Sequence, residues 1–427
     1  MTEKTAPSEP SPRSRPPAAP NRYTPLRFVL AFGVVSMLAD FVYEGGRSIV
    51  GPYLATLGAS ATIVGLVTGL GEAVASVLRL ASGPFADRTR RHWPISIAGY
   101  AITAVSVPVL AVAGTLWQAS LAVIGERFGK AVRTPARDTM LSHASAHLGR
   151  GRAFAYHEAL DQSGALLGPL LVAGMVAISG YRLGFAVLAI PAALALVALA
   201  VVRRAVPNPA AYEPEGAAKT QPAPKAPPAG GTGRLRLVRG FSKPFWLYTA
   251  FTAASVTGFA TFGVLSYHLE VRHVVSAPLI PVVYAVAMGV DALAALGSGF
   301  LYDRVGFRGL VVLPLLTAAV PFLSFSTSVL LIWIGAILWG AALGVHESTM
   351  RAAVADLVPA ARRGTGYGLF TAVYGLTWLG GSTAIGALYG RSTTAIEVFV
   401  GALQVMALAL LVPLLRDGRG PQLAASS

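Results

Sequence analysis

One short pattern occurs twice in this chain, about half a chain length apart, and each copy lies between long apolar runs. The copies are residues 83–91 (GPFADRTRR) and residues 299–308 (GFLYDRVGFR). Each places a glycine four residues before an aspartate, so that both lie on one face at the end of a helix. The arginines that follow cannot enter lipid, and they therefore mark a hairpin at a membrane surface. The repeat indicates a membrane protein built from two related halves.

The composition agrees with this interpretation. Only 12% of the 427 residues are charged, 54% are hydrophobic, and the mean hydropathy is +0.61. Soluble domains carry roughly 25% charged residues. Although the net charge of +15 is typical of nucleic-acid binders, the basic residues fall in loops on alternate sides of the apolar runs, which is a topology signal. We therefore expect a lipid bilayer and no nucleic acid as a partner.

At about 20 apolar residues per crossing, the chain is predicted to be an all-α membrane protein. We expect twelve transmembrane helices in two pseudo-symmetric six-helix bundles, residues 26–203 and 244–415. The expected connections are a disordered cytoplasmic tail (1–25), a Pro/Ala/Gly-rich cytoplasmic linker (204–243) and a second cytoplasmic tail (416–427). The predicted spans are 26–46, 60–84, 93–113, 116–141, 152–177, 182–203, 244–268, 278–301, 308–326, 328–355, 364–389 and 393–415.

Arginine and lysine set the expected orientation. They crowd into the tails, the linker and the even-numbered loops, whereas the opposite loops carry little beyond Arg182, Arg272 and Arg391. By the positive-inside rule both termini are predicted to be cytoplasmic in a multi-pass protein of the plasma membrane.

The duplicated hairpin resembles the cytoplasmic-loop signature of the major facilitator superfamily. The second copy matches it fully, whereas the first carries Arg90 where the family prefers glycine. Span five adds Gly164, Gly168 and Pro169, which resemble a signature of the superfamily's drug/proton antiporters, although Val172 and Ala173 replace a later glycine pair. The resemblance covers residues 25–415. It implies a central cavity lined by spans one, four, seven and ten, and two halves that rock around a midplane site.

Charged side chains at mid-membrane depth are the candidate functional residues. Asp40, Tyr43, Glu44 and Arg47 share one stripe of span one, and Asp40 lies roughly 20 Å into a core of about 30 Å. A buried carboxylate needs a paired base, water or a proton. The functional reading is a proton or substrate site, and the alternative is a structural ion pair with Arg47.

Span four carries a basic ladder of Arg127, Lys130 and Arg133, and the resemblance identifies Arg127 with an arginine implicated in proton coupling. If spans one and four line the cavity, Asp40 and Glu44 are expected to face Arg127 and Lys130. The alternative is a permanent salt bridge. The full predicted proton and substrate cavity comprises Asp40, Tyr43, Glu44, Glu72, Arg127, Lys130, Asp161, Asp291, His346 and Glu347.

The hairpins are predicted to gate the cytoplasmic side. Asp87 is expected near Gly366, Arg88 or Arg91 is expected to pair with Asp138, and Arg304 or Arg308 with Asp356. Asp303 is expected near residues 152–153. The predicted gate comprises Gly83, Asp87, Arg88, Arg91, Asp138, Gly299, Asp303, Arg304, Arg308 and Asp356.

The glycines of span five, Gly164 and Gly168, are expected to allow close helix packing, and Pro169 to bend the span. Aromatic residues of spans ten and eleven, Trp339 and Trp378 among them, either stack on an organic substrate or pack the core.

We expect a secondary transporter that exports a small organic solute in exchange for protons. The alternatives are a proton-coupled importer of a nutrient or metal chelate and a non-transporting receptor. An enzyme is not expected, because the sequence has no GxSxG motif, Walker A motif or His/Cys metal spacing, and it has no cysteine. No metal and no cofactor are predicted, since a proton gradient supplies the energy, and a monomer is expected.

Overall fold

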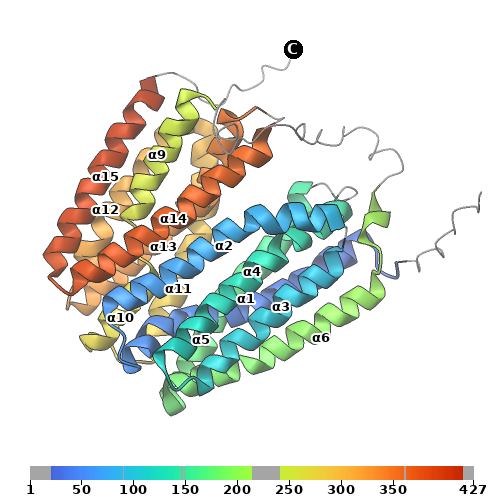
Figure 1. The fold of residues 1–427 in the computed structure, drawn as a ribbon, viewed down its shortest axis with the longest axis horizontal. Coiled ribbons are helices and arrows are strands. Elements are labelled where there is room, and N and C mark those ends of the chain that lie inside the picture. The colour runs from blue at the N-terminus through green and yellow to red at the C-terminus, as the bar shows by residue number, and fades with distance from the viewer. Residues whose placement is uncertain are drawn as a thin grey trace, which may run out of the picture.

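In the computed structural model every regular element of the described residues is helical (Figure 1). The described residues are 21–89, 91–145, 148, 150–213, 241–359 and 362–416. The first half consists of α1 (Pro25–Thr56), α2 (Ala61–Thr89), α3 (His92–Val109), η1 (Leu110–Val112), α4 (Leu116–Ser145), α5 (Arg150–Val187), α6 (Ala189–Ala205) and η2 (Pro209–Tyr212). The second half consists of α9 (Lys243–Thr257), α10 (Phe262–Val271), α11 (Leu279–Val305), η3 (Gly306–Val311), α12 (Val312–Ser324), α13 (Val329–Leu357), α14 (Arg363–Tyr389) and α15 (Thr393–Arg416).

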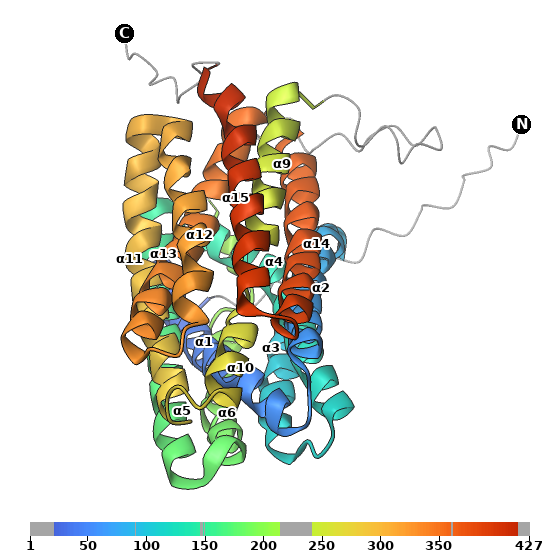
Figure 2. The same ribbon diagram turned by 90° about the vertical axis from the view of Figure 1, so that its left-hand side faces the viewer.

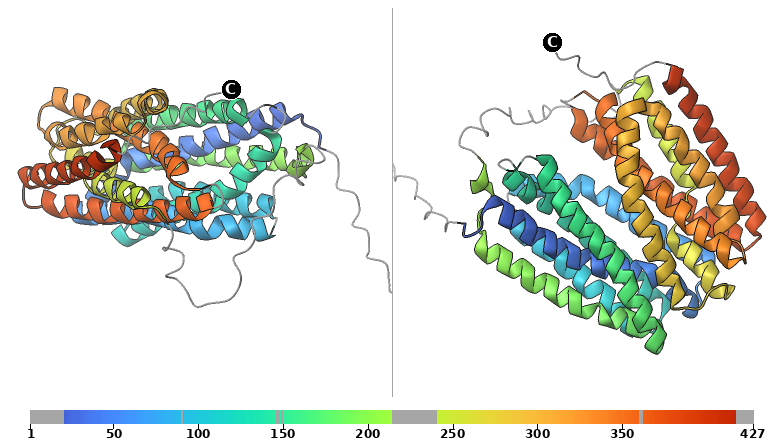
Figure 3. Two further views of the ribbon diagram at one scale, coloured as in Figure 1. Left: turned by 90° about the horizontal axis from the view of Figure 1, so that it is seen from above. Right: turned by 180° about the vertical axis from the view of Figure 1, so that it is seen from behind.

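Helices of each half gather into their own group, and the two groups lie side by side (Figures 2 and 3). We call the end at which α1 begins and α15 ends the proximal end, and the other the distal end. Eight segments of the described residues are long and apolar enough to cross a membrane. Two of them, residues 155–205 and 279–324, have 51 and 46 residues, which is enough for two crossings each at about 20 residues per crossing. The chain is therefore a multi-pass membrane protein.

The two halves meet through two long helix pairs, α2 with α14 and α5 with α11, and through α1 with α10 at the distal end. Glycines make this approach possible. A Cβ atom on Gly65 would lie 2.1 Å from the carbonyl oxygen of Ser382, and one on Gly51 would lie 2.1 Å from that of Gly263. Backbones at this separation tolerate no side chain, which is why small residues stand at helix crossings in membranes.

The halves separate toward the proximal end. Among the described residues, α4 and α13 are not one of the closely packed helix pairs that join the halves. Glu158 of α5 and Glu347 of α13 are both exposed, yet they interact electrostatically with each other. Two exposed carboxylates that face each other from different halves line a shared polar space rather than lipid. We call this space the cleft.

Predicted span 244–268 lies within one segment, residues 243–271, that is long and apolar enough to cross a membrane, but its helix is interrupted between α9 and α10. The freed backbone carbonyls find side-chain donors instead. The Trp339 indole donates to the Ala260 oxygen at 2.8 Å, and the Gln404 amide donates to the Ser255 oxygen at 3.1 Å. Such partners allow non-helical backbone at membrane depth.

Other boundaries also differ from the predicted ones. Predicted spans five and six join within α5 at a kink, where Ser179 is non-helical and Gly180 takes a φ of 74°. The predicted linker starts too early, since residues 204–205 are helical and η2 packs on the first half, where Tyr212 donates to the Tyr23 oxygen at 2.6 Å. Arg416 is helical rather than part of a tail. Residues 1–20, 214–240 and 417–427 lie outside the described residues, so the predicted disorder of the tails and linker stays a prediction there.

Candidate functional site

A buried cluster of two arginines and a glutamate lies at the centre of the first half. Glu72 of α2 accepts from Arg47 of α1 at 3.2 Å and from Arg127 of α4 at 3.1 Å, so one carboxylate joins three helices. Tyr43 accepts hydrogen bonds from both guanidinium groups. Arg127 also contacts Glu126 at 3.4 Å. Charge-assisted bonds of this kind offset the desolvation of the ions, which are all at least four-fifths buried.

Asp40 pairs with Arg133 at 3.1 Å rather than with Arg127 or Lys130, which corrects the predicted partners. The reason is geometric. Helices α1 and α4 run in opposite directions, so residues earlier in α1 meet residues later in α4. Lys130 instead places its ammonium 3.7 Å from the centre of the Tyr43 ring, in a cation–π contact.

Glu44 links the two halves. It accepts a hydrogen bond from the Tyr284 hydroxyl of α11, and its other neighbour is Arg47 at 3.7 Å. The pairing of Glu44 with Arg47 is the structural ion pair that the sequence offered as the alternative to a proton or substrate site. The bond to Tyr284, in contrast, crosses to the other half. This bond is a direct contact between the charged residues of α1 and the second half.

A second polar group lies closer to the proximal end. Arg137 of α4 contacts Asp138 at 3.0 Å and Asp161 of α5 at 3.9 Å. Behind them, His157 hydrogen-bonds to Ser36 at 2.8 Å, and Ser36 to Tyr100 at 3.2 Å. This network joins α1, α3, α4 and α5, and it holds the cleft wall of the first half in one arrangement.

Asp161 belongs to a group in which His157, Glu158 and Asp161 bring their ligand atoms within 4.8 Å of one another. The sequence predicts no metal site, and this group has metal-like spacing on one helix. Two of its members already have other partners, since His157 bonds to Ser36 and Asp161 contacts Arg137. A guanidinium beside the carboxylate works against a metal ion there.

The predicted cavity residues of the second half are not paired in this way. Asp291 of α11 is 3% exposed, and its Oδ1 atom has no hydrogen-bond partner among the described residues. His346 of α13 is 2% exposed, and its Nε2 atom likewise has no such partner. Glu347, the next residue, is exposed to the cleft.

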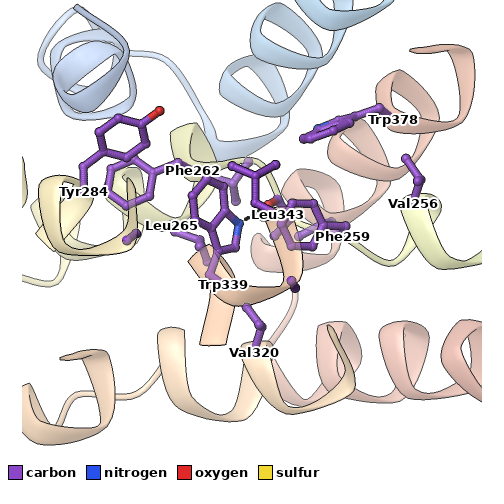
Figure 4. Close-up of a cluster of buried hydrophobic side chains, with 14 of the residues drawn as sticks. Val256, Phe259, Phe262, Leu265, Tyr284, Val320, Trp339, Leu343 and Trp378 are labelled. Carbon is purple, nitrogen blue, oxygen red and sulfur yellow. Dashed lines mark hydrogen bonds between the residues drawn. The ribbon is translucent and has the colours of Figure 1, made fainter. Parts of the chain in front are cut away.

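An aromatic cluster closes the second half toward the distal end (Figure 4). Trp339 lies at its centre, with ring centroids 5.5 Å from both Phe259 and Phe262, and the tilted rings of Phe262 and Tyr284 have centroids 4.5 Å apart. Trp378 lies 5.5 Å from Phe259. Trp339 and Trp378 are 0% and 3% exposed, so in this conformation both pack the core, which was the alternative to substrate stacking.

A cavity of about 30 Å³ remains beside the first cluster, between Tyr43, Glu126, Arg127 and Thr261. A water molecule needs at least about 10–15 Å³ of such volume, so the cavity holds one or two waters and no organic solute. It reaches the start of α10 at Thr261, which hydrogen-bonds to Thr68 of α2 at 3.0 Å. The distal end is thus closed over the charged cluster.

The predicted gate pairs are not formed here. Asp138 contacts Arg137 of its own helix, and Asp356 accepts from Tyr302 at 2.9 Å. Arg88, Arg91, Arg304 and Arg308 are exposed, and none forms a salt bridge within the described part of the chain. Each expected pair lies within one half, so the separation of the halves is not the reason; Asp138 and Asp356 have nearer partners in Arg137 and Tyr302.

The remaining gate residues lie at the same end. Asp303 is exposed. Gly83 has Pro135 of α4 as the nearest neighbour of an added Cβ at 3.9 Å, and an added Cβ on Gly299 meets nothing within 4 Å. The side chain of Asp87 lies outside the described residues, so its expected approach to Gly366 stays a prediction.

The span-five glycines lie against α1. A Cβ atom on Gly164 would lie 2.1 Å from the Met37 oxygen, and one on Gly168 would lie 2.3 Å from the Phe41 oxygen. Pro169 is buried inside α5 directly after this contact. The glycines therefore position Asp40 and the α5 carboxylates on neighbouring helices.

Sequence reasoning missed four residues of the charged clusters: Glu126, Arg133, Arg137 and Tyr284. Arg133 was visible as the third step of the basic ladder, but the antiparallel register that brings it to Asp40 was not considered. Glu126 and Arg137 are also charged residues of span four, so their charge within an apolar span could have identified them as candidates. Tyr284 gave no signal, because a tyrosine in an apolar span is ordinary.

Comparisons with known proteins agree with this architecture. The family profile described as "Major Facilitator Superfamily" matches residues 34–382 and 273–425. An uncharacterized protein of Mycobacterium tuberculosis is 51% identical over 387 residues, which cover 90% of this chain and 92% of the relative. An uncharacterized MFS-type transporter of Methanocaldococcus jannaschii is 24% identical over 400 residues, which cover 90% and 94%.

Solved structures share the fold at low identity. A mutant of the nucleoside transporter NupG superposes with a TM-score of 0.71 at 16% identity, covering 90% of this chain and 99% of that one. A mutant of a POT peptide transporter in complex with alafosfalin gives 0.70 at 15%, covering 92% and 95%. An inward-facing bacterial homolog of the human lysosomal transporter Spinster gives 0.64 at 16%, covering 91% and 94%. With its family profile, its helical membrane fold and its transporter relatives in hand, the chain belongs to the Major Facilitator Superfamily of secondary transporters.

Proposed function

We propose that this protein exports a small organic solute across the plasma membrane in exchange for protons, by alternating access. Both termini are cytoplasmic in this proposal. Twelve crossings form two six-helix bundles, residues 26–203 and 244–415, with α9 and α10 together making one crossing. The conformation described here is then open to the cytoplasm and closed at the distal end.

The observation that carries the proposal is the set of buried ion pairs between α1, α2 and α4. Asp40, Glu72 and Arg133 each lie deep in the helical segments and each depends on a partner from another helix. Protonating a carboxylate frees its arginine and weakens the contact between helices. Charged groups of this kind inside a membrane mark ion and proton pathways.

The link to the second half supports coupling to the conformational change. Glu44 contacts Arg47 within the first half and accepts from Tyr284 in the second. Protonated Glu44 no longer attracts Arg47, and its bond to Tyr284 loses the contribution of the charge. A change in proton occupancy at this position therefore changes the strength of the contact between the halves at the distal end, which is what coupling proton movement to alternating access requires.

The test uses purified full-length protein in proteoliposomes that enclose a pH-sensitive dye, with candidate solutes added outside. Antiport predicts that solute entry drives protons out of the vesicle, and that Asp40→Asn abolishes this movement while Glu397→Gln, on the outer helix α15, retains it. Proton entry together with the solute would instead establish a symporter. Absence of movement for every solute, in wild type and Asp40→Asn alike, would favour a non-transporting protein.

A further inference from the structure

Asp291 of α11 lies within electrostatic range of carboxylates from both halves. It lies close enough to Glu347 of α13, Glu44 of α1 and Glu158 of α5 to interact electrostatically with each. The basic side chain that also reaches Asp291 is Arg47, which is already engaged by Glu72 at 3.2 Å and Glu44 at 3.7 Å. Acidic side chains therefore outnumber basic ones around Asp291.

Asp291 shows most clearly that a ligand is needed. It is 3% exposed, and its Oδ1 atom has no hydrogen-bond partner among the described residues. The carboxylates Asp40, Glu72, Glu126 and Asp161 of the first half each contact a guanidinium within 4 Å. A buried carboxylate without a counter-charge is costly, and a cation in the cleft would relieve that cost.

The surroundings of Asp291 favour an organic cation over a bare metal ion. Tyr284 and Met288 lie on the same face of α11, seven and three residues earlier, and both are buried. Beyond them lie Phe262 and Trp339, whose ring centroids are 4.5 Å and 6.2 Å from that of Tyr284 (Figure 4). A carboxylate on the same helix face as a thioether and close to several aromatic rings suits a cation with an apolar body.

We propose that the transported solute is an organic cation, held by Asp291 and Glu347 of the second half beneath the aromatic cluster of Tyr284, Phe262 and Trp339. This inference rests on the proposed transport function and names the substrate class of its cleft. The two halves then divide the work. The first half carries the proton, and the second half selects the solute by its positive charge.

Binding of matched probes to purified full-length protein in detergent tests the proposal by equilibrium dialysis. Tetraphenylphosphonium is a permanent aromatic cation, and tetraphenylborate has the same shape with the opposite charge. We expect the cation to bind and the borate not to compete with it. Asp291→Asn is expected to weaken cation binding at least tenfold, and Glu347→Gln somewhat less, because Glu347 is exposed to solvent screening. Glu397→Gln, an acid on α15, is the control with unchanged binding.

One further variant and one competitor distinguish loss of the cation site from misfolding and from metal binding. Asp291→Glu retains the charge and is expected to keep most of the binding, which separates loss of the carboxylate from misfolding. Mn²⁺ is added as a competitor, and binding of Mn²⁺ in place of tetraphenylphosphonium would assign the carboxylates to a metal ion and overturn the proposal. Equal competition by the borate, or unchanged affinity in both Asp291→Asn and Glu347→Gln, would also overturn it.

The experiments distinguish failure of the cation-site proposal from failure of the proposed transport function. If the proteoliposomes couple protons to a neutral or anionic solute and tetraphenylphosphonium does not bind, the substrate class is wrong while proton-coupled transport stands. If tetraphenylphosphonium binds and binding depends on Asp291, but no solute moves protons, the cation site stands and the transport proposal fails.

Discussion

The first half of the molecule holds its buried carboxylates in salt bridges with arginines, whereas the described residues of the second half form no salt bridge. Every salt bridge between described residues lies within residues 40–213. Both halves bury polar atoms without a partner among the described residues. Those of Glu126, Arg133 and Asp161 belong to side chains that also form salt bridges, whereas Asp291 of the second half forms none. Two halves with related hairpins and the same helical architecture have thus acquired different chemistry.

This difference follows the two tasks that coupling requires. A proton carrier needs a charge that is stable when paired and costly when its partner is lost, since that cost is what drives a helix to move. A solute site needs groups that are incomplete without the solute, so that binding supplies what the protein lacks. Ion pairs in one half and unpartnered groups in the other meet these two needs. The predictions below probe this contrast.

The largest effect is expected from Arg133→Gln. This change removes the partner of Asp40 at 3.1 Å and leaves a buried carboxylate without a counter-charge. Breaking a buried pair in this way costs about 3–5 kcal/mol. We expect a large drop in the unfolding temperature of the detergent-purified protein and loss of proton coupling. The double variant Asp40→Asn/Arg133→Gln is expected to regain much of the stability but no coupling. A single variant as stable as wild type would show that the pair contributes little.

Tyr284→Phe is expected to have the next largest effect, because it removes the bond from α11 to Glu44 and leaves the packing of the ring unchanged. Hydrogen bonds to charged groups contribute about 1.5–3 kcal/mol. The variant should shift the population toward conformations with an open distal end. The chain has no cysteine, so spin labels at Thr115→Cys and Ser328→Cys report the distal end without background. Ser142→Cys and Pro359→Cys report the proximal end. Longer proximal distances in the variant would contradict the prediction.

The sequence predicted those parts of the molecule that depend on local patterns. Apolar runs, arginine-rich hairpins and glycine spacing indicate helices and their order, because each span must satisfy its own backbone and bury its own apolar surface. The break between α9 and α10 was not predictable in this way. It depends on Trp339 and Gln404, far along the chain, donating to the freed carbonyls of Ala260 and Ser255.

For the candidate site, the sequence identified charged residues at depth but not their partners. Asp40, Glu44, Glu72 and Arg127 all belong to the two charged clusters of the first half. Which base meets which acid depends on the relative height of two antiparallel helices, and the sequence of either helix does not specify that height. The contrast between the halves was likewise hidden, since Asp291 looks like any other intramembrane acid in the sequence.

Asp291→Asn tests the contrast between the two halves through the unfolding temperature of the protein. Without ligand, an isolated buried carboxylate destabilises the fold, so replacing it with a neutral amide is expected to stabilise the protein by about 1 kcal/mol. Asp40→Asn, the matched change in the first half, is expected to destabilise it, because Arg133 then loses its partner. Opposite shifts of the unfolding temperature in the two variants would support the contrast. Equal destabilisation by both would mean that Asp291 has a protein partner after all.

The smallest effect is expected from Thr68→Val. The Thr68 hydroxyl lies 3.0 Å from that of Thr261 and connects α2 to the start of α10 beside the small cavity. Valine keeps the shape of threonine and removes two neutral hydrogen bonds, one to Thr261 and one that Thr68 donates to the Val64 oxygen within α2. Each such bond contributes about 0.5–1.5 kcal/mol. The spin labels at Thr115→Cys and Ser328→Cys should therefore show a modest gain of the distal-open population, smaller than in Tyr284→Phe. Thr377→Val is the matched control, since Thr377 donates only within α14, to Val373 and Tyr374. A shift as large as that of Tyr284→Phe would show that neutral contacts, and not the charged Glu44, hold the distal end closed.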